Sequence, residues 1–186
     1  MAKKNALIIV IAVFALVVLL SGFTYVPEGS TGVVKTLGMP NGRVFAGGVH
    51  LKAPFVQSVE MVNNNPQSLA MMVDAITKDG HAAETTVFVN YEIRPDNSLD
   101  IVRNIGALLC ENKILIPAAR ESVKSVTAKY TAEGLITERA GMSEEIARSL
   151  EEKVSPYGIT VEYAGILNYD FGEAINRAIE EKLATQ

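Results

Sequence analysis

A long apolar segment near the N-terminus constrains this chain more than any other feature. Residues 6–26 (ALIIVIAVFALVVLLSGFTYV) begin with fifteen consecutive apolar residues, and no charge follows before Glu28. Twenty-one helical residues at about 1.5 Å each extend about 31 Å, close to the thickness of the hydrocarbon core of a bilayer. Backbone amides in lipid must be bonded within the segment, so a lone span has to be helical. The sequence therefore predicts a transmembrane anchor over residues 6–26.

The charges on either side of this segment predict its orientation. Lys3 and Lys4 precede it, and Glu28 is the first charge after it. The positive-inside rule then keeps residues 1–5 in the cytoplasm and sends the remaining 160 residues to the exported side. No long basic presequence is seen, which favours a bacterial or phage-encoded protein. We expect a single-pass protein of the bacterial inner membrane whose body lies on the periplasmic face.

Two other interpretations of the apolar segment are weaker. A cleaved signal peptide also has a basic start and an apolar run, but this run is long for one, and Leu20-Ser21-Gly22 is a poor cleavage site. With no cysteine near its end, lipoprotein processing is not expected. A buried core helix would show a polar face, and this segment has none.

The composition of the body excludes several classes of function. Of 17 basic residues, Lys3 and Lys4 precede the anchor, which leaves 15 basic against 21 acidic residues in the body. This balance argues against a nucleic-acid partner and against a polybasic lipid site. Cys110 is the only cysteine, and its apolar neighbours predict a buried thiol. His50 and His81 lack further ligands at metal-binding spacing, so we expect no metal and no cofactor.

The order of the expected elements places the body in the α+β class. Short apolar runs predict strands over 32–37 and 69–77, and alternating apolar and polar residues predict strands over 84–94 and 159–171. The turn Lys78-Asp79-Gly80 joins the second and third as an antiparallel hairpin. A bulge at Gly165-Ile166 would interrupt the last strand. The apolar faces are expected to be Val87, Val89, Tyr91 and Ile93 in the third strand, and Ile159, Val161, Tyr163, Leu167, Tyr169 and Phe171 in the last.

Helices are expected between the third and fourth strands. Asp96-Asn97-Ser98 can cap a short helix that runs to Gly106. Pro117 suits the first turn of a second helix, and Thr137 can cap a third. Apolar residues at helical spacing predict the buried sides of the two longer helices, which are Ala119, Val123, Val126 and Tyr130 in one and Met142, Ile146, Leu150 and Val154 in the other.

A glycine-led apolar loop is expected over residues 47–55, after a turn at residues 38–42. The residues alone leave two interpretations open. In one, the loop lies at the membrane surface, with Leu51, Pro54 and Phe55 touching lipid. In the other, it is a tight turn whose apolar residues join the core, because single exposed apolar residues are common.

Several short motifs of the body, in order along residues 25–186, resemble the SPFH (band 7) superfamily. They are VPEG at 26–29, GGVHLKAPF at 47–55, TKDG at 77–80 and YGITV at 157–161. Within the superfamily the chain looks most similar to the prohibitins, through IP at 116–117, KSV at 124–126 and YTAEGLITER at 130–139. The resemblance implies an SPFH domain over residues 27–171, built as an antiparallel sheet with packed helices, and then a short amphipathic helix over 172–186.

This resemblance implies a function as well as a fold. Members of the superfamily are membrane-anchored scaffolds that oligomerise laterally, organise a membrane microdomain and, among prohibitins, regulate a membrane-bound AAA protease. The implied partners are membrane lipids, the chain itself or a related SPFH subunit, and such a protease. The resemblance also places Leu51, Pro54 and Phe55 at or in the outer leaflet, which favours the lipid-contact interpretation of their loop.

The last helix departs from the family pattern. In the family it usually continues into a long charged coiled coil, whereas this chain stops at Gln186. We expect either a short member or a truncated one. The apolar stripe of this helix is expected either to contact a neighbouring copy or to pack on its own domain, and its residues are Ala174, Ile175, Ala178, Ile179 and Leu183.

Catalysis is not expected from this sequence. The glycines between Gly29 and Gly48 lack the strand-to-helix setting and the Lys-Ser or Lys-Thr of a nucleotide loop. Glu144-Glu145 and Glu151-Glu152 are most simply the solvated side of a helix, and Asp79 suits a turn better than a general acid. The alternative to a scaffold is a monomeric tethered adaptor that binds the exported domain of one membrane partner. A hydrolase is the weakest option.

Overall fold

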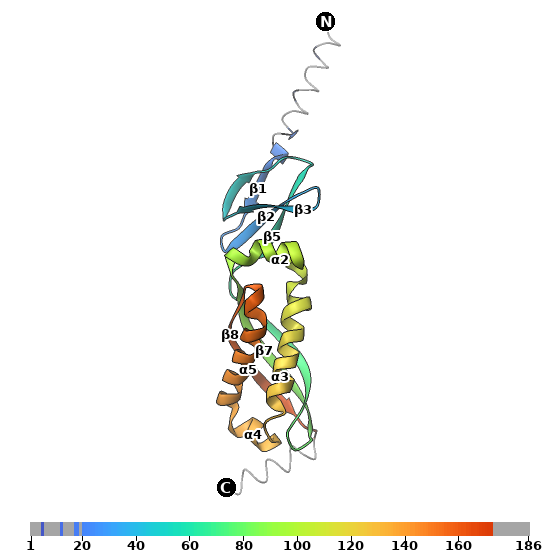
Figure 1. Ribbon diagram of the computed structural model, residues 1–186. Coiled ribbons are helices and arrows are strands. Elements are labelled where there is room, and N and C mark those ends of the chain that lie inside the picture. The colour runs from blue at the N-terminus through green and yellow to red at the C-terminus, as the bar shows by residue number, and fades with distance from the viewer. Residues whose placement is uncertain (1–4, 6–11, 13–16, 19, 173–186) are drawn as a thin grey trace. The chain divides into compact units, whose positions relative to one another are not determined.

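The computed structural model of the chain describes residues 5, 12, 17, 18 and 20–172 (Figure 1). The amphipathic helix predicted over 172–186 and most of the predicted anchor lie outside these residues. The chain, whose body we expected to form one domain over 27–171, divides into two compact units. Unit 1 contains residues 1–65 and 95–107, and unit 2 contains residues 66–94 and 108–186. Each unit combines antiparallel strands with helices, so the α+β class is confirmed.

The described residues of unit 1 form two small sheets and a helix. β1 (Phe23–Val26) pairs antiparallel with β4 (Gly48–Leu51). β2 (Ser30–Thr36) lies between β3 (Met39–Phe45) and β5 (Gln57–Asn63). A 3-10 turn at Pro95–Asn97 leads into α2 (Ser98–Asn104), which packs against β2, β3 and β5. The core of the unit contains Val26, Val34 and Phe45, with Val59 packed against them.

Three boundaries predicted in this region were wrong. Residues 23–26, which we assigned to the anchor, form β1, and the described helical residues end at Ser21. The residues FTYV favour a strand, and pairing with β4 satisfies their backbone. In the expected loop at 47–55, residues 48–51 form β4, and the turn expected over 38–42 is confined to Leu37-Gly38 because β3 begins at Met39.

No helix among the described residues is long and apolar enough to cross a membrane.

In unit 2, a sheet with the order β6-β7-β8 carries helices on one side. Its antiparallel strands are β6 (Gln67–Ile76), β7 (Ala82–Ile93) and β8 (Ile159–Asp170). A short π-helical segment at Glu111–Leu115 leads into α3 (Ile116–Thr127), and α4 (Ala132–Thr137) precedes α5 (Arg139–Val154). α3 contacts β6, α5 contacts β8, and the two helices lie side by side against the sheet (Figure 1).

The packing predicted for unit 2 is largely confirmed. β6 and β7 form the expected hairpin, with Gly80 at a positive φ of 83° in its turn. The thiol of Cys110 is buried, and burial raises its pKa. The predicted apolar positions of β7 and of the two longer helices are buried, and these are Val87, Val89, Tyr91, Ile93, Ala119, Val123, Val126, Met142, Ile146, Leu150 and Val154.

Three predictions in unit 2 were wrong. Thr137 ends α4 instead of capping α5, and the capping threonine is Thr131, whose hydroxyl accepts a bond from the N–H of Gly134 at 3.1 Å. Tyr130 lies beyond the end of α3. In β8 the pairing with β7 shifts twice, which leaves Glu162 and Leu167 as extra residues. Each bulge reverses the alternation, so Tyr163 and Leu167 are exposed and the core contains residues 164–166 instead.

Candidate membrane-contact surface

The ribbon of β1 and β4 presents an apolar face to solvent. Phe23 lies directly opposite Leu51, and Tyr25 lies opposite Val49. Residues two apart on a strand and residues directly opposite each other share a face, so these four side chains form one surface. Each of them is more than half exposed. A contiguous apolar face of this kind marks a contact with another molecule or with a membrane.

A second group of exposed apolar residues lies in the loop after β4 and in the β2–β3 turn. The N–H of Lys52 donates to the carbonyl of Gly22 at 2.8 Å, so this loop begins beside the residue that precedes β1. The same loop ends beside the β2–β3 turn, because the N–H of Leu37 donates to the carbonyl of Val56 at 2.9 Å. The exposed apolar side chains of this end, which we call the apolar end of unit 1, are Leu37, Met39, Phe55 and Val56.

Leu37 and Phe55 adopt a backbone conformation that is rare for their residue types. Their φ angles are 50° and 63°, in the left-handed region. Non-glycine residues there cost of order 1–3 kcal/mol and cluster at functional sites. These two side chains are also 78% and 82% exposed. The backbone strain therefore coincides with the presentation of two large apolar groups to the surroundings.

Hydrogen bonds within the loop hold Phe55 in place. The N–H of Ala53 donates to Oε1 of Gln57 at 2.8 Å, and the N–H of Gln57 donates back to the carbonyl of Ala53 at 3.0 Å. The N–H of Val56 donates to the carbonyl of Pro54 at 2.8 Å. The N–H groups of Ala53, Val56 and Gln57 are therefore paired within the loop, which lowers the cost of moving this part of the backbone out of water.

Packed and charged groups support the strands beneath this end. The rings of Phe45 and His50 stack with centroids 4.4 Å apart, and Nε2 of His50 lies 2.7 Å from the carbonyl oxygen of Ala46. Lys35 and Glu60 form an ion pair at 2.8 Å between β2 and β5. Burial opposes the charge of Glu60, but the bonds from Lys35 and from the N–H of Ala107 hold its pKa below the usual value.

Of the three predicted membrane-contact residues, Leu51 lies on the exposed face of the β1–β4 ribbon, and Pro54 and Phe55 lie in the loop after β4. Leu51 and Phe55 are exposed and Pro54 is half-buried. Their contact with lipid stays a prediction. Sequence reasoning missed the neighbouring residues of β1 and of the β2–β3 turn. Two large apolar residues in the turn Leu37-Gly38-Met39 were a signal that could have found part of the surface. The predicted oligomer-contact residues, 174, 175, 178, 179 and 183, lie outside the described residues.

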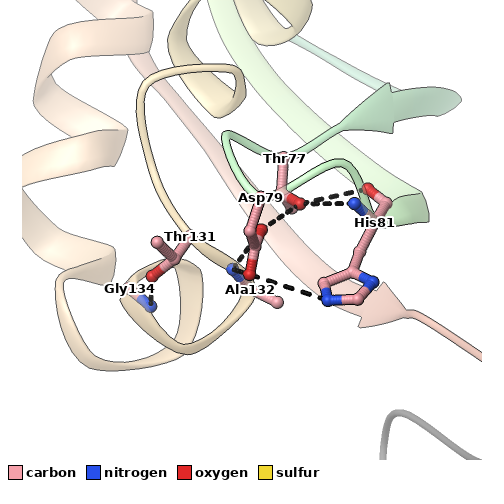
Figure 2. Close-up of polar contacts among 6 residues, drawn as sticks. All are labelled: Thr77, Asp79, His81, Thr131, Ala132 and Gly134. Carbon is pink, nitrogen blue, oxygen red and sulfur yellow. Dashed lines mark hydrogen bonds and ion pairs between the residues drawn. The ribbon is translucent and has the colours of Figure 1, made fainter.

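In unit 2, Asp79 links the hairpin turn to the first turn of α4 (Figure 2). The Thr77 hydroxyl donates to its Oδ1 at 2.5 Å, and the N–H of Ala132 donates to both carboxylate oxygens at 3.2 and 3.4 Å. Nε2 of His81 lies 3.7 Å from Oδ2. The bond from Thr77, helped by Ala132 and His81, holds the pKa of Asp79 below its usual value. These contacts give Asp79 a structural role in joining two segments.

A groove of about 580 Å³ lies between α5 and β8, and sequence reasoning did not find it. Ala140, Ala147 and Tyr163 supply its apolar lining. A Cβ at Gly165 would come within 2.5 Å of the Tyr163 hydroxyl, so a larger residue there would require the Tyr163 side chain to move. The described residues contain no cluster of three or more His, Cys, Asp or Glu side chains that could hold a metal ion.

Comparison with known proteins identifies a matching family and several similar proteins. The sequence model of the family described as "SPFH domain / Band 7 family" matches residues 24–186 of this chain. Prohibitin-1 of Saccharomyces cerevisiae is 29% identical over 195 residues, covering 100% of this chain and 67% of the yeast protein. Prohibitin-7, mitochondrial, of Arabidopsis thaliana is 28% identical over 142 residues, which cover 75% of this chain and 50% of that protein. Mitochondrial prohibitin complex protein 1 of Caenorhabditis elegans is 26% identical over 139 residues, which also cover 75% of this chain and 50% of that protein. The chain thus spans half to two thirds of these relatives.

Proposed function

Since the chain belongs to the SPFH domain / Band 7 family, as its motifs predicted, we propose that it is a membrane-anchored scaffold. In this proposal the chain associates laterally with its own copies or with related subunits, organises a patch of bilayer and regulates a membrane-bound AAA protease. Membership of a family whose relatives here are prohibitins supports a scaffold role over an enzymatic one. The apolar end of unit 1, beside Gly22, is the observation that carries the proposal.

The anchor of this scaffold is residues 6–22. β1 begins at Phe23, so the apolar segment available to a helix contains 17 residues. These would extend about 26 Å, at the short end of the range for a bilayer span. With Lys3 and Lys4 in the cytoplasm, the body lies on the exported side. A span that ends at residue 22 brings Phe23 and the loop beside it to the interface of the same bilayer.

The apolar end of unit 1 then rests in the outer leaflet. Full burial of a large apolar side chain contributes about 1.5–3 kcal/mol, so Leu37 and Phe55 together favour this position by several kcal/mol. Phe23 and Tyr25 are aromatic, as is common at the membrane interface. The strained backbone at positions 37 and 55 is explained if both side chains serve this contact.

Lateral association uses the apolar stripe of the helix that the sequence predicts over residues 172–186. One relative carries the word "complex" in its name, which supports an assembling role for this chain. Residues 174, 175, 178, 179 and 183 form an apolar stripe between charged residues. Such a stripe favours packing against a neighbouring copy.

Crosslinking of the full chain in native membranes tests the proposal. We expect adducts between copies of the chain, in a fraction that resists alkaline extraction. Ile179→Asp places a charge in the stripe and should reduce these adducts several-fold, whereas Glu180→Ala on the polar side should not. A chain that is released by alkali, or that gives only adducts with one other protein, contradicts the scaffold.

A further inference from the structure

The sheet of unit 2 has two outer edges, and α5 covers only one of them. β7 is central, so β6 and β8 form the edges. Glu151 of α5 accepts a bond from the N–H of Val161 at 2.5 Å. Arg139 donates to the carbonyls of Ile166 and Leu167 at 2.5 and 3.0 Å. These charged side chains bond to backbone groups of β8, and β8 also contains two bulges. Both features protect a sheet edge, so we regard β8 as closed to a further strand.

The β6 edge carries none of these protections within the described chain. β6 pairs with β7 through ten consecutive residues without a register shift. Its sequence, QSLAMMVDAI, contains no proline or lysine and only one charge, Asp74. In the described structure the backbone of residues 68–76 bonds only to β7. Alternate N–H and C=O groups of an outer strand point away from the sheet, so β6 presents an uninterrupted row of open groups.

The side chains along this edge alternate in a defined way. Met72 and Ile76 are 61% and 63% exposed, and Asp74 lies between them on the same face. Asp74 is directly opposite Glu84, which is opposite Asp170 on β8, so three carboxylates form one cross-strand row. Neither Asp74 nor Glu84 takes part in an ion pair with another described residue. A strand added at β6 would therefore meet an acidic position flanked by two apolar ones.

We propose that β6 is the docking edge for an extended segment of a partner protein, which adds to the sheet as a fourth, antiparallel strand. This segment carries apolar side chains opposite Met72 and Ile76 and a basic side chain opposite Asp74. Main-chain bonds to the open edge supply affinity, and the alternate side chains supply specificity. The inference depends neither on self-association nor on bilayer contact by unit 1.

A second copy of the chain fits this edge less well than a basic segment. If the second copy paired through its own β6, its one charged residue would be Asp74. That carboxylate would be repelled by the acidic row at this edge. Its β8 is closed by Glu151 and Arg139. Charge complementarity therefore favours a foreign strand that is apolar and basic.

Binding of labelled peptides to the full chain in detergent micelles tests the proposal. We expect the blocked peptide TVTKTVT to bind saturably by fluorescence anisotropy, and its twin TVTETVT to bind about fivefold more weakly, as a cross-strand charge pair predicts. Asp74→Lys should reverse this order, and its binding of the glutamate peptide would show that the variant is folded. Failure of both peptides to bind, or an unchanged order in the variant, overturns the proposal.

Three further measurements separate strand pairing from other contacts. In a paired strand every second peptide N–H bonds to β6, and the N–H groups between them point away from it. N-methylation of the first set should therefore abolish binding, and N-methylation of the second set should preserve it. Equal effects of the two methylations would refute strand pairing. Met72→Lys should weaken binding of the lysine peptide, whereas Leu167→Lys, at a similarly exposed position of the closed edge, should not. A disulfide between copies of Met72→Cys, in a Cys110→Ser background, would show that a second copy occupies the edge and would overturn the proposal.

Discussion

Phe55→Trp in full-length chains reconstituted into vesicles is expected to give a blue-shifted tryptophan emission that brominated lipid tails quench. The chain contains no other tryptophan, so the signal reports position 55 alone. The side chain is 82% exposed in the protein, and quenching by brominated tails distinguishes burial in lipid from burial against another protein. Burial of an aromatic ring contributes about 2 kcal/mol, which corresponds to about a thirtyfold preference for the bilayer. Nearly all loops should then be inserted.

Leu108→Trp is the matched control for this measurement. Leu108 is 89% exposed, and it belongs to unit 2. Its tryptophan should emit at the wavelength of a solvated ring and should not be quenched. Equal emission and equal quenching at the two positions would show that the loop after β4 does not enter the bilayer.

Leu150→Ala should strongly lower the free energy of unfolding of unit 2. Leu150 is fully buried on the side of α5 that faces the sheet and α3. Truncation of a buried leucine removes apolar contacts and leaves a cavity, with a typical cost of about 2–5 kcal/mol. Thermal or denaturant unfolding of the full chain, followed by circular dichroism, measures this loss.

Arg148→Ala is the control on the same helix. The Arg148–Glu144 ion pair, at 3.2 Å, is formed by side chains that are largely exposed. Such pairs contribute less than about 1 kcal/mol, so the free energy of unfolding should change little. A loss for Leu150→Ala as small as that for Arg148→Ala would mean that α5 does not pack against the sheet as described.

The helices of unit 2 could be predicted from the sequence because their apolar residues recur at one period. Met142, Ile146, Leu150 and Val154 are four apart, and a single face of a helix contains all of them. The hairpin was equally visible, since regular alternation in β7 met an Asp-Gly turn. In both cases the local pattern and the tertiary packing favour the same structure.

The predictions that failed depend on contacts that a local pattern does not contain. Phe23 to Val26 are apolar and follow an apolar segment, so only pairing with β4 separates the strand from the anchor. The bulges in β8 reverse the alternation at Glu162 and Leu167 without a distinctive residue type. Asp79 bonds to Ala132, 53 residues further along the chain, which no spacing rule reveals.

The membrane-contact surface could be predicted only in part, for a related reason. Residues 51, 54 and 55 stood out because apolar residues followed a pair of glycines. Leu37 joins them through the bond between its N–H and the carbonyl of Val56, which is a tertiary contact. Exposure of large apolar side chains is a property of the folded unit, so the full extent of the surface required the structure.

Imaging of the full-length chain in lipid membranes by electron cryo-microscopy tests the central claim most directly. We predict copies arranged side by side, each with Leu37 and Phe55 of unit 1 at the outer leaflet and the body on the exported side. Isolated single copies, or bodies whose unit 1 stands clear of the bilayer, would contradict a membrane-anchored lateral scaffold.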